Sequence, residues 1–513
     1  MRLRAITALP LLACLHCSSP AEPGDAGPTG GSGGSPNPGS GSVSGTGGGT
    51  TPGVGGASSS GGASSSGGSS SDAGAPGSGG AVSGVPVEGD ACSFTVAHEQ
   101  SSAIGTVTII NWSTDLAGVT EAHIDFGPAD GDWAMSAPVD LEQAGYRTLL
   151  LGMKPAREYG FRLVAAGASG TCTSADVAVT TGPAPTDIKL PVLTKVEEQA
   201  GGVQGFYLAS PGIRTAEPRN LPGAYIFDTD GDLVWWTPES VEHISAAQMS
   251  WDGQAMWYVN ANGGDLYRTT MDGLSTDAFD AGTAEHDLVP LPEGGVATFA
   301  RNDDGTSVLI EVQDDGTFSE IVQLPDIYTT STETYHPNAL GYYERDDTFT
   351  ISDLNLDGFV KITRLGELIW QLGGENPLGD SFDLVGTDHA GGHGHDLGPN
   401  GQFLFFDNAF DSAISLVVEL LLDEDAWTAH KTWEYSLGSQ SMYLGAAQRL
   451  PNGNTSVVHS MAGKVLEVTP AGELVQSFDN SVSFQEDGLN AAVFGYVRFR
   501  PTLYGPPQSY WPD

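Results

Sequence analysis

Positively charged side chains are scarce in this chain of 513 residues, which has 20 Lys and Arg against 64 Asp and Glu. The formal net charge of -44 creates a negative field that repels nucleic acid phosphates and anionic lipid headgroups. Charged residues of both signs make up only 16% of the chain, a content that suits a β-rich protein better than a helical one. We therefore expect an all-β fold and no nucleic-acid partner.

Long hydrophobic runs are also absent. No segment beyond the N-terminus reaches the roughly 18 consecutive apolar residues that a membrane-spanning helix requires. The longest run, ISLVVELLL from Ile414, is shorter and contains Glu419. The body of the chain is therefore not expected to cross a membrane as a helix.

The N-terminus has the features of an export signal. Arg2 and Arg4 precede an apolar stretch, residues 5–13, which is too short to span a bilayer and is typical of a secretory signal peptide. The stretch leads into Leu-Leu-Ala-Cys, which resembles the lipobox of bacterial lipoproteins and implies that Cys14 is lipidated. The alternative is an ordinary signal with an incidental cysteine, and Cys17 is a poorer candidate because a histidine precedes it.

A linker is expected after this signal peptide, which covers residues 1–17. Residues 18–87 form the linker, because up to Ser83 they are almost entirely Gly, Ser, Pro, Ala and Thr and cannot offset the entropy of ordering. A flexible chain of this length spans roughly 45 Å root-mean-square. It would hold an exported protein clear of the outer membrane or cell surface to which a lipid on Cys14 was anchored.

Residues 88–183 are predicted to form a small β-sandwich, because short runs of alternating apolar residues follow one another there, as in GTVTIINWSTD and REYGFRLVAAG. The region resembles a fibronectin type III or immunoglobulin-like module. By that resemblance Trp112 is the buried early-strand tryptophan and Tyr159 the corner tyrosine. Cys92 and Cys172 are the two remaining cysteines, and in an exported chain we expect them to form a disulfide.

A short segment, made of an apolar strand and a Gly-containing turn, occurs five times in the rest of the chain. The copies begin at positions 245, 286, 336, 395 and 445, which are 41, 50, 59 and 50 residues apart. This spacing suits the four-stranded blade of a β-propeller, and residues 187–513 are long enough for six blades of about 50 residues. The segment from Val493 is expected to supply the strand that closes the ring. Three copies begin with a histidine on a strand that should line the central channel: His286, His336 and His395.

The motifs of this region resemble those of a known family. Over most of residues 205–500 the chain contains, in this order, GAYIFDTDGDLVWW, HDLVPL, HPNALGYYERDD, LIWQLGG, HDLGPNGQFLFFDN and GAAQRLPNGN. Together they resemble the bacterial arylsulfotransferases, six-bladed propellers of the periplasm or cell exterior. The resemblance implies transfer of a sulfuryl group from an aryl sulfate to a phenol, without a nucleotide donor or any other cofactor.

The resemblance also assigns catalytic roles. His395 matches the nucleophile, and His286 and His336 match the flanking histidines. Asn338 matches the asparagine that follows the second of these, two residues later. A neutral imidazole can attack sulfur to form a covalent sulfohistidine, and a second histidine can protonate the departing phenolate. Two further histidines in the segment DHAGGHGHD remain rivals for the nucleophile: His389 and His393.

One departure from the family pattern concerns an arginine. The family usually places it after the Ile-Ser of the blade that contains His336, where this chain has Asp353 and Leu354. A guanidinium is the most obvious clamp for a sulfate group, so its loss favours an alternative function, a non-catalytic binding scaffold at the cell surface. The sequence leaves the oligomeric state open. Five cations are candidates to replace the arginine: Arg301, Lys361, Arg449, Arg498 and Arg500.

Two acidic turns are weighed as metal sites. DLNLDG from Asp353 matches the first half of an EF-hand loop, but Arg364 stands where the twelfth-position glutamate is required. A plain hairpin turn is therefore expected there, and likewise for DTDGD from Asp228. The following pair, Trp235 and Trp236, is expected to pack within a blade. No metal site is predicted.

Overall fold

The computed structural model describes residues 84–212, 220–241, 243–260, 264–387, 392–410, 412–480, 485–486, 489–490 and 494–511. All of them fall within one compact unit, residues 77–513. These described residues form β-strands and three short 3-10 turns, η1 (Ala144–Tyr146), η2 (Leu324–Asp326) and η3 (Ser460–Ala462). No helix among them is long and apolar enough to cross a membrane. The predictions for the signal peptide, Cys14, His389 and most of the linker lie outside the described residues.

The N-terminal part is a β-sandwich, as expected. Its two antiparallel sheets enclose a core of buried aromatic and aliphatic side chains. One sheet consists of β1 (Val85–Glu88), β2 (Ser93–Gln100), β3 (Thr108–Thr114) and β6 (Thr148–Leu150). The other consists of β5 (Met135–Pro138), β4 (Val119–Pro128), β7 (Glu158–Gly167), β8 (Gly170–Thr173) and β9 (Val177–Thr180).

The first strand corrects one expected boundary. The composition places residues 84–87 in the linker, but β1 pairs along its whole length with β2. Val87 packs against the sandwich core, and the ladder satisfies the backbone groups of a segment too short to show alternation in the sequence. The sandwich therefore begins at Val85.

A disulfide joins Cys92 to Cys172 with a Cα–Cα distance of 6.0 Å, as predicted. The two cysteines are 80 residues apart, so the chain-entropy model gives about 4 to 5 kcal/mol of stabilisation. Trp112 is fully buried in the same core. The hydroxyl of Tyr159 accepts a hydrogen bond of 2.8 Å from the backbone N–H of Lys154, which is the kind of upstream backbone contact that a corner tyrosine makes. Kinship with fibronectin modules stays a prediction.

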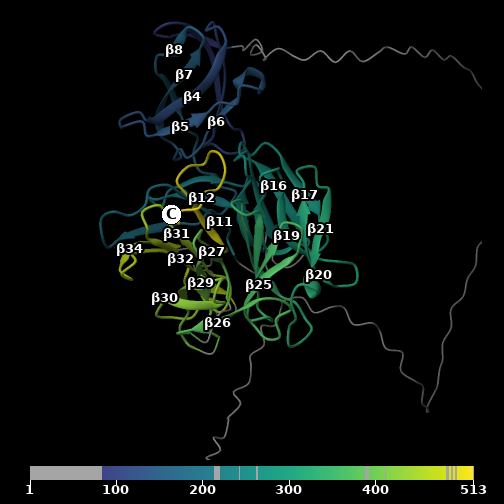
Figure 1. The fold of residues 1–513 in the computed structure, drawn as a ribbon. Coiled ribbons are helices and arrows are strands. Elements are labelled where there is room, and N and C mark those ends of the chain that lie inside the picture. Colours follow the sequence, from purple (N-terminus) through teal and green to yellow (C-terminus); the bar gives the residue numbers. More distant parts are fainter. Residues whose placement is uncertain are drawn as a thin grey trace, which may run out of the picture. The chain divides into compact units, whose positions relative to one another are not determined.

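The rest of the described chain is a six-bladed β-propeller (Figure 1). From the channel outward, the first three blades are β37 (Val497–Arg500), β11 (Phe206–Ala209), β12 (Tyr225–Asp228) and β13 (Leu233–Trp236); β14 (Ile244–Met249), β15 (Ala255–Asn260), β16 (Asp265–Thr270) and β17 (Thr276–Asp280); and β18 (Glu285–Pro290), β19 (Val296–Arg301), β20 (Ser307–Val312) and β21 (Phe318–Gln323).

Blades four to six follow the same plan with two additions, the extra strand β26 and the strand β10. They are β22 (Pro337–Tyr343), β23 (Thr348–Asp353), β24 (Gly358–Thr363) and β25 (Leu368–Gly373); β27 (His395–Leu397), β28 (Gln402–Asp407), β29 (Leu416–Asp423) and β30 (Thr428–Ser436); and β31 (Ala446–Arg449), β32 (Thr455–His459), β33 (Lys464–Val468), β34 (Leu474–Asn480) and β10 (Leu193–Glu197). Strand β26 (Ser381–Val385) pairs in parallel with β25 and β30, and β35 (Gln485–Glu486) pairs with β36 (Leu489–Asn490).

The ring closes through the C-terminal strand. β37 pairs with β11, so the last blade-forming strand of the chain is the innermost strand of the first blade, as the sequence predicts. Each innermost strand contacts the next around the axis, in the order β37, β14, β18, β22, β27, β31 and back to β37. The five repeated segments thus supply five of the six innermost strands, and no blade is left with an open inner edge.

Turn chemistry and blade packing follow the sequence. Gly316, in the Asp-Gly turn between β20 and β21, has a φ of +81°, which a residue with a side chain rarely adopts. Trp235 and Trp236 are buried between blades, and the indole N–H of Trp235 donates to the carbonyl of Met271 at 2.8 Å.

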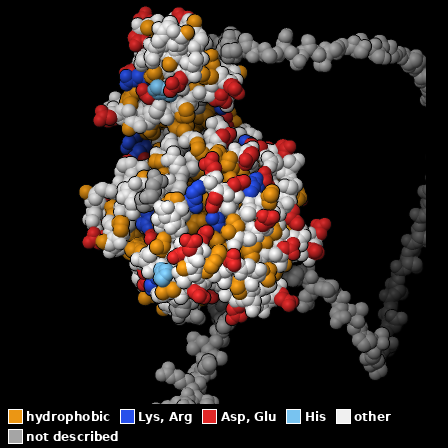
Figure 2. Space-filling view, viewed as in Figure 1, with side chains coloured by type: hydrophobic (Ala, Val, Ile, Leu, Met, Phe, Trp, Pro, Cys, Tyr) orange, Lys and Arg blue, Asp and Glu red, His pale blue; other side chains and the backbone are white. Residues whose placement is uncertain are grey.

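The face seen in Figure 2 has many scattered carboxylates and few cations, in keeping with the composition.

Candidate functional site

Three histidines and an asparagine meet in the channel, near the first residues of the innermost strands. His286 is in β18, His336 directly precedes β22, Asn338 is in β22, and His393 lies two residues before β27. We call these four residues the histidine cluster. The structure thus brings together three of the four predicted catalytic residues, and it adds His393, which the sequence offered only as a rival.

The first pair in the cluster is His286 and His336. Their Nε2 atoms lie 3.1 Å apart and their rings meet edge to face. Burial and the nearby His336 and His393 rings lower the pKa of His286 well below its ordinary value. Burial also lowers the pKa of His336, although the Asp353 carboxylate opposes this. Both rings are therefore neutral at pH 7, and the pair shares a single proton between its two Nε2 atoms.

The hydrogen bonds of Asn408 decide the tautomer of His393. The Asn408 side-chain NH2 donates to the carbonyls of Ser441 at 2.8 Å and Leu444 at 2.9 Å, so both of its N–H groups are used. Its Oδ1 atom is therefore an acceptor, and it is hydrogen-bonded to His393 Nδ1. The Nδ1 atom must carry the ring proton, which leaves a lone pair on Nε2.

That lone pair faces the rest of the cluster. Asn338 Nδ2 lies 3.4 Å from His393 Nε2, and the hydroxyl of Tyr496 holds the Asn338 backbone by donating to its carbonyl. Burial lowers the pKa of His393 to about 4, with the hydrogen bond to Asn408 opposing the shift and His336 adding to it. His393 is thus a neutral, buried imidazole with its Nε2 lone pair directed at the cluster.

His395, the expected nucleophile, does not join the cluster. Its Nε2 atom is hydrogen-bonded to the hydroxyl of Thr350 at 2.6 Å, and its ring packs against Phe359 and Phe403. Burial lowers its pKa to about 3, with Arg498 as the next largest cause. The ring lies further along the channel than His393, since two residues of extended chain span roughly 6 to 7 Å.

A β-bulge explains why His286 and His395, which both begin a His-Asp-Leu sequence, do not lie at the same level of the channel. In β18 the register shifts between Glu285 and Leu288, and His286 has a φ of +65° within the bulge. In β27 His395 pairs regularly with Phe405. The bulge inserts residues into one strand only, so identical letters lie at different levels of the channel. Sequence spacing alone carries no signal of such a shift.

Asp353 stands where the family usually has an arginine, and its carboxylate has a structural role. Its carboxylate accepts hydrogen bonds of 2.8 Å from the backbone N–H of His336 and from the hydroxyl of Tyr328. It also accepts from the backbone N–H groups of Asn355 and Leu356 in the turn that follows. Asp353 therefore fixes the backbone at His336, and DLNLDG is the hairpin turn between β23 and β24, as predicted.

Arg301 occupies the equivalent position one blade earlier. It is the last residue of β19, as Asp353 is the last residue of β23, and both second strands return to the level where the innermost strand begins. Its Nη2 atom lies 3.0 Å from Glu285 Oε1, and the other Glu285 oxygen lies 3.7 Å from His286 Nδ1. The Arg301 side chain is 31% exposed, so part of the guanidinium remains accessible beside the cluster.

The other four candidate cations lie elsewhere. Lys361 is paired with Asp346 at 2.6 Å, Arg449 with Glu419, and Arg500 donates to the carbonyl of Gly505. Arg498 lines a cavity beside His395. Of the five, Arg301 is the one that adjoins the histidine cluster.

A small cavity of about 10 Å³ opens at His393, enough for a single water molecule. Leu354 and Phe410 line it, and their side chains are 37% and 48% exposed. Exposed apolar side chains beside a buried imidazole suit the aromatic part of a substrate.

The second acidic turn holds an ammonium group. Asp228, Asp230 and Asp232 have carboxylate oxygens within 4.8 Å of one another. The Nζ atom of Lys154 lies 3.0, 2.6 and 2.7 Å from these three residues, so a side chain already supplies the positive charge. The turn is the β12–β13 hairpin that the sequence predicts.

A family model described as Arylsulfotransferase (ASST) matches residues 193–491, which is more than half of the chain. The chain belongs to the arylsulfotransferase family. The match spans the propeller from β10 to β36, and it supports an arylsulfotransferase-like function with aryl sulfates and phenols as substrates. No curated protein matches the chain.

Several solved structures are similar to part of this chain at low sequence identity. A protein of unknown function from Bacteroides caccae has 13% identity and a TM-score of 0.39, covering 57% of this chain and 98% of its own. A streptogramin B lyase has 14% identity and a TM-score of 0.33, with 56% and 76% covered. A virginiamycin B lyase from Staphylococcus aureus has 13% identity and a TM-score of 0.36, with 55% and 87% covered.

Proposed function

We propose that this protein transfers a sulfuryl group from an aryl sulfate to a phenol through a sulfohistidine on His393, with no nucleotide donor. The observation that carries the proposal is the hydrogen-bond set of His393. Asn408 Oδ1 accepts a hydrogen bond from the protonated Nδ1, so the Nε2 lone pair can attack sulfur. Family membership supplies the substrate class.

Bonds and protons balance over the two half-reactions. His393 Nε2 attacks sulfur, the bond from sulfur to the aryl oxygen breaks, and the phenolate leaves with the electron pair while the shared N–H of His286 and His336 donates a hydrogen bond to its oxygen. The acceptor phenol then passes its proton to this neutral pair as its oxygen attacks sulfur, and the bond between sulfur and nitrogen breaks. The pair releases that proton to solvent, from which the first phenolate takes one up.

The charge and shape of the surroundings support binding of the aryl sulfate at the histidine cluster. The developing charge on the sulfuryl oxygens would be met by the accessible guanidinium of Arg301 and by the amide of Asn338. The aromatic ring would lie against Leu354 and Phe410 at the mouth of the small cavity. Arg301 thus stands in for the missing arginine from the neighbouring blade.

We also propose that the protein is exported and anchored by a lipid on Cys14. The disulfide between Cys92 and Cys172 supports export, because disulfides persist in oxidising compartments. A Cys14→Ser protein should then fractionate as soluble material, whereas the unaltered chain should fractionate with membranes.

A burst experiment tests the transferase. With 4-nitrophenyl sulfate and no acceptor, the protein should release about one equivalent of nitrophenol and gain one sulfuryl group by intact mass, because the donor half-reaction needs no acceptor. His393→Ala should abolish both signals, whereas His395→Ala, checked for folding by circular dichroism, should keep the burst. Loss of the burst in the His395 variant alone would return the nucleophile to His395. No burst with any aryl sulfate would favour a non-catalytic scaffold.

A further inference from the structure

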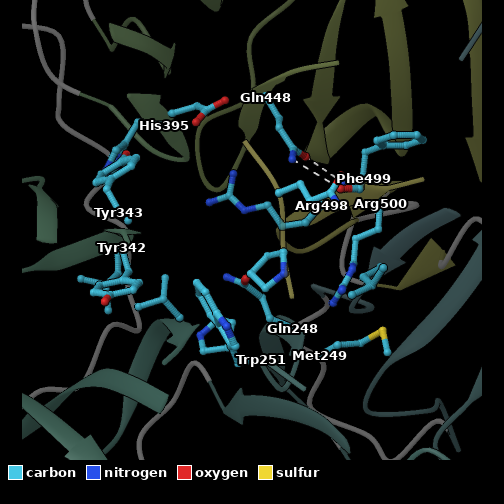
Figure 3. A pocket seen from close by; sticks show the side chains of 18 residues that line it. Gln248, Met249, Trp251, Tyr342, Tyr343, His395, Gln448, Arg498, Phe499 and Arg500 are labelled. Carbon is cyan, nitrogen blue, oxygen red and sulfur yellow. Dashed lines mark hydrogen bonds between the residues drawn. The ribbon is translucent and has the colours of Figure 1, made fainter. Parts of the chain in front are cut away.

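The channel contains a second cavity, of about 130 Å³, separate from the histidine cluster. It lies towards the ends of the innermost strands, where it is lined by Gln248 in β14, Tyr342 in β22 and Gln448 in β31. Figure 3 shows Arg498 reaching from β37 toward the middle of this cavity. The cavity is large enough for one small ring, whereas the cavity at His393 has room for one water.

Arg498 is the unusual group in this cavity. Among the residues that the structure describes, its side chain forms no hydrogen bond and no ion pair, although it is partly buried. The other inner arginines are engaged, Arg301 by Glu285, Arg449 by Glu419 and Arg500 by Gly505. A chain with 64 acidic and 20 basic side chains offers many partners, so an unpaired guanidinium in a cavity points to an anionic ligand.

The walls beside Arg498 are aromatic. Trp251 and Tyr342 lie edge to face with ring centroids 6.0 Å apart, and Tyr343 stands on the same side as His395 in Figure 3. The side-chain amide of Gln248 already donates to the carbonyl of Leu288 at 2.6 Å. The guanidinium is therefore the main free donor, and the rest of the surface suits a flat apolar ring.

Two carboxylates near Arg498 limit the strength of anion binding. Asp287 accepts from the backbone N–H groups of Leu288 and Leu340, and Asp396 accepts from the backbone N–H of Arg449. Both lie close enough to Arg498 for its charge to oppose the rise in their pKa that burial causes. Neither forms an ion pair with it among the described residues. Their negative charge opposes a second anion, so a ligand needs the aromatic contacts as well as the guanidinium.

We propose that this cavity binds a small aromatic anion, a sulfonate, sulfate or carboxylate on a single ring, through Arg498. The charged group pairs with the guanidinium and the ring lies among Trp251, Tyr342 and Tyr343. The site is distinct from the histidine cluster and does not rest on the proposed transferase activity.

Calorimetric titration with benzenesulfonate tests the proposal, because this anion has no ester oxygen and cannot donate a sulfuryl group. The unaltered protein should bind it, Arg498→Gln should weaken binding at least tenfold, and Arg498→Lys should lie between them because ammonium lacks the bidentate geometry. Arg162→Gln, which changes an exposed arginine in β7 of the sandwich, is the control and should leave the affinity unchanged. Equal binding by the Arg498→Gln protein would overturn the proposal, because the affinity would then come from another site.

Two further arms separate the sources of affinity. Cyclohexanesulfonate and inorganic sulfate should both bind more weakly than benzenesulfonate, and equal affinity for sulfate would overturn the role of the aromatic walls. If the Arg498→Gln protein does not fold, a crystal of the unaltered protein soaked in benzenesulfonate decides the matter. The sulfonate should lie within hydrogen-bond distance of Arg498, and a sulfonate seen only at His393 would contradict the site.

Discussion

The Nε2 atoms of His286 and His336 lie 3.1 Å apart, so two neutral rings hold one proton between them. Burial disfavours a second proton on either ring, and the neighbouring ring disfavours it further on His286. The pair can therefore donate a hydrogen bond to the departing phenolate and take up the proton of the acceptor phenol, as a transfer between two phenols requires.

Replacing His336 with alanine should slow transfer by about 100-fold to 10,000-fold, the usual range for acid-base assistance. The loss should be larger for phenyl sulfate than for 4-nitrophenyl sulfate, because nitrophenolate needs less help from an acid to leave. Initial rates with the two donors and a saturating phenol measure this difference. His430→Ala, at an exposed position outside the channel, is the control. Equal losses for both donors would mean that His336 does not stabilise the leaving oxygen.

The stability of the protein should depend on pH through His393. Its pKa falls to about 4 in the folded protein against 6.5 in a free side chain, so the unfolded chain binds the extra proton between these values. The contribution is complete above pH 6.5 and is lost as the pH falls to 4. In His393→Asn, the slope of unfolding free energy against pH in this window should therefore shrink by up to about 1.4 kcal/mol per pH unit.

Urea unfolding at several pH values between 4 and 7 measures this slope. Only the change in slope is diagnostic, because the substitution also alters packing at every pH. His430→Asn, an exposed change in β30, should keep the slope of the unaltered protein. A slope that does not change in His393→Asn would show that this ring is protonated equally in the folded and unfolded chain.

Much of the architecture follows from local chemistry that the sequence displays. Asp-Gly and Asn-Gly turns at regular spacing give the blades, and the repeated segments give five of the innermost strands. The ring closure by β37 follows from the leftover apolar strand at the C-terminus. The boundary of the sandwich was less visible, because β1 is a short strand that contains a proline.

The catalytic arrangement was only partly predictable for a physical reason. Which histidine meets the cluster depends on the level of each innermost strand along the channel, and the bulge at His286 changes that level without changing the letters. Asn408, which sets the tautomer of His393, is the last residue of the motif HDLGPNGQFLFFDN, but the motif does not show that its side chain meets His393. Arg301 could be named as a candidate, but its place beside Glu285 depends on the pairing of β18 with β19.

If Arg301 replaces the family arginine, its loss should act on the chemical step. Arg301→Gln should lower kcat/KM for aryl sulfates by about 100-fold to 1,000-fold, the usual cost of losing one donor to a developing oxyanion. Arg301→Lys should recover part of this activity because the charge remains. Arg345→Gln, which changes an exposed arginine in the turn after β22, is the control. An undiminished rate in Arg301→Gln would mean that groups other than Arg301 stabilise the charge on the sulfuryl oxygens.

Lys154 should stabilise the fold through the three carboxylates that surround it. Its side chain is 14% exposed, Asp228 is similarly buried, and Asp230 and Asp232 are more exposed. Lys154→Met would leave three carboxylates close together, so the loss should fall between that of an exposed pair, roughly 0 to 1 kcal/mol, and that of a buried one, roughly 3 to 5 kcal/mol. Lys431→Met, which removes an exposed partner of Glu434, should cost far less.

Since 1 M salt screens charges beyond about 3 Å, thermal unfolding in 1 M NaCl should show a smaller deficit for Lys154→Met than unfolding at low salt. A deficit that salt does not change would mean that lost packing of the lysine stem, and not charge, accounts for the effect.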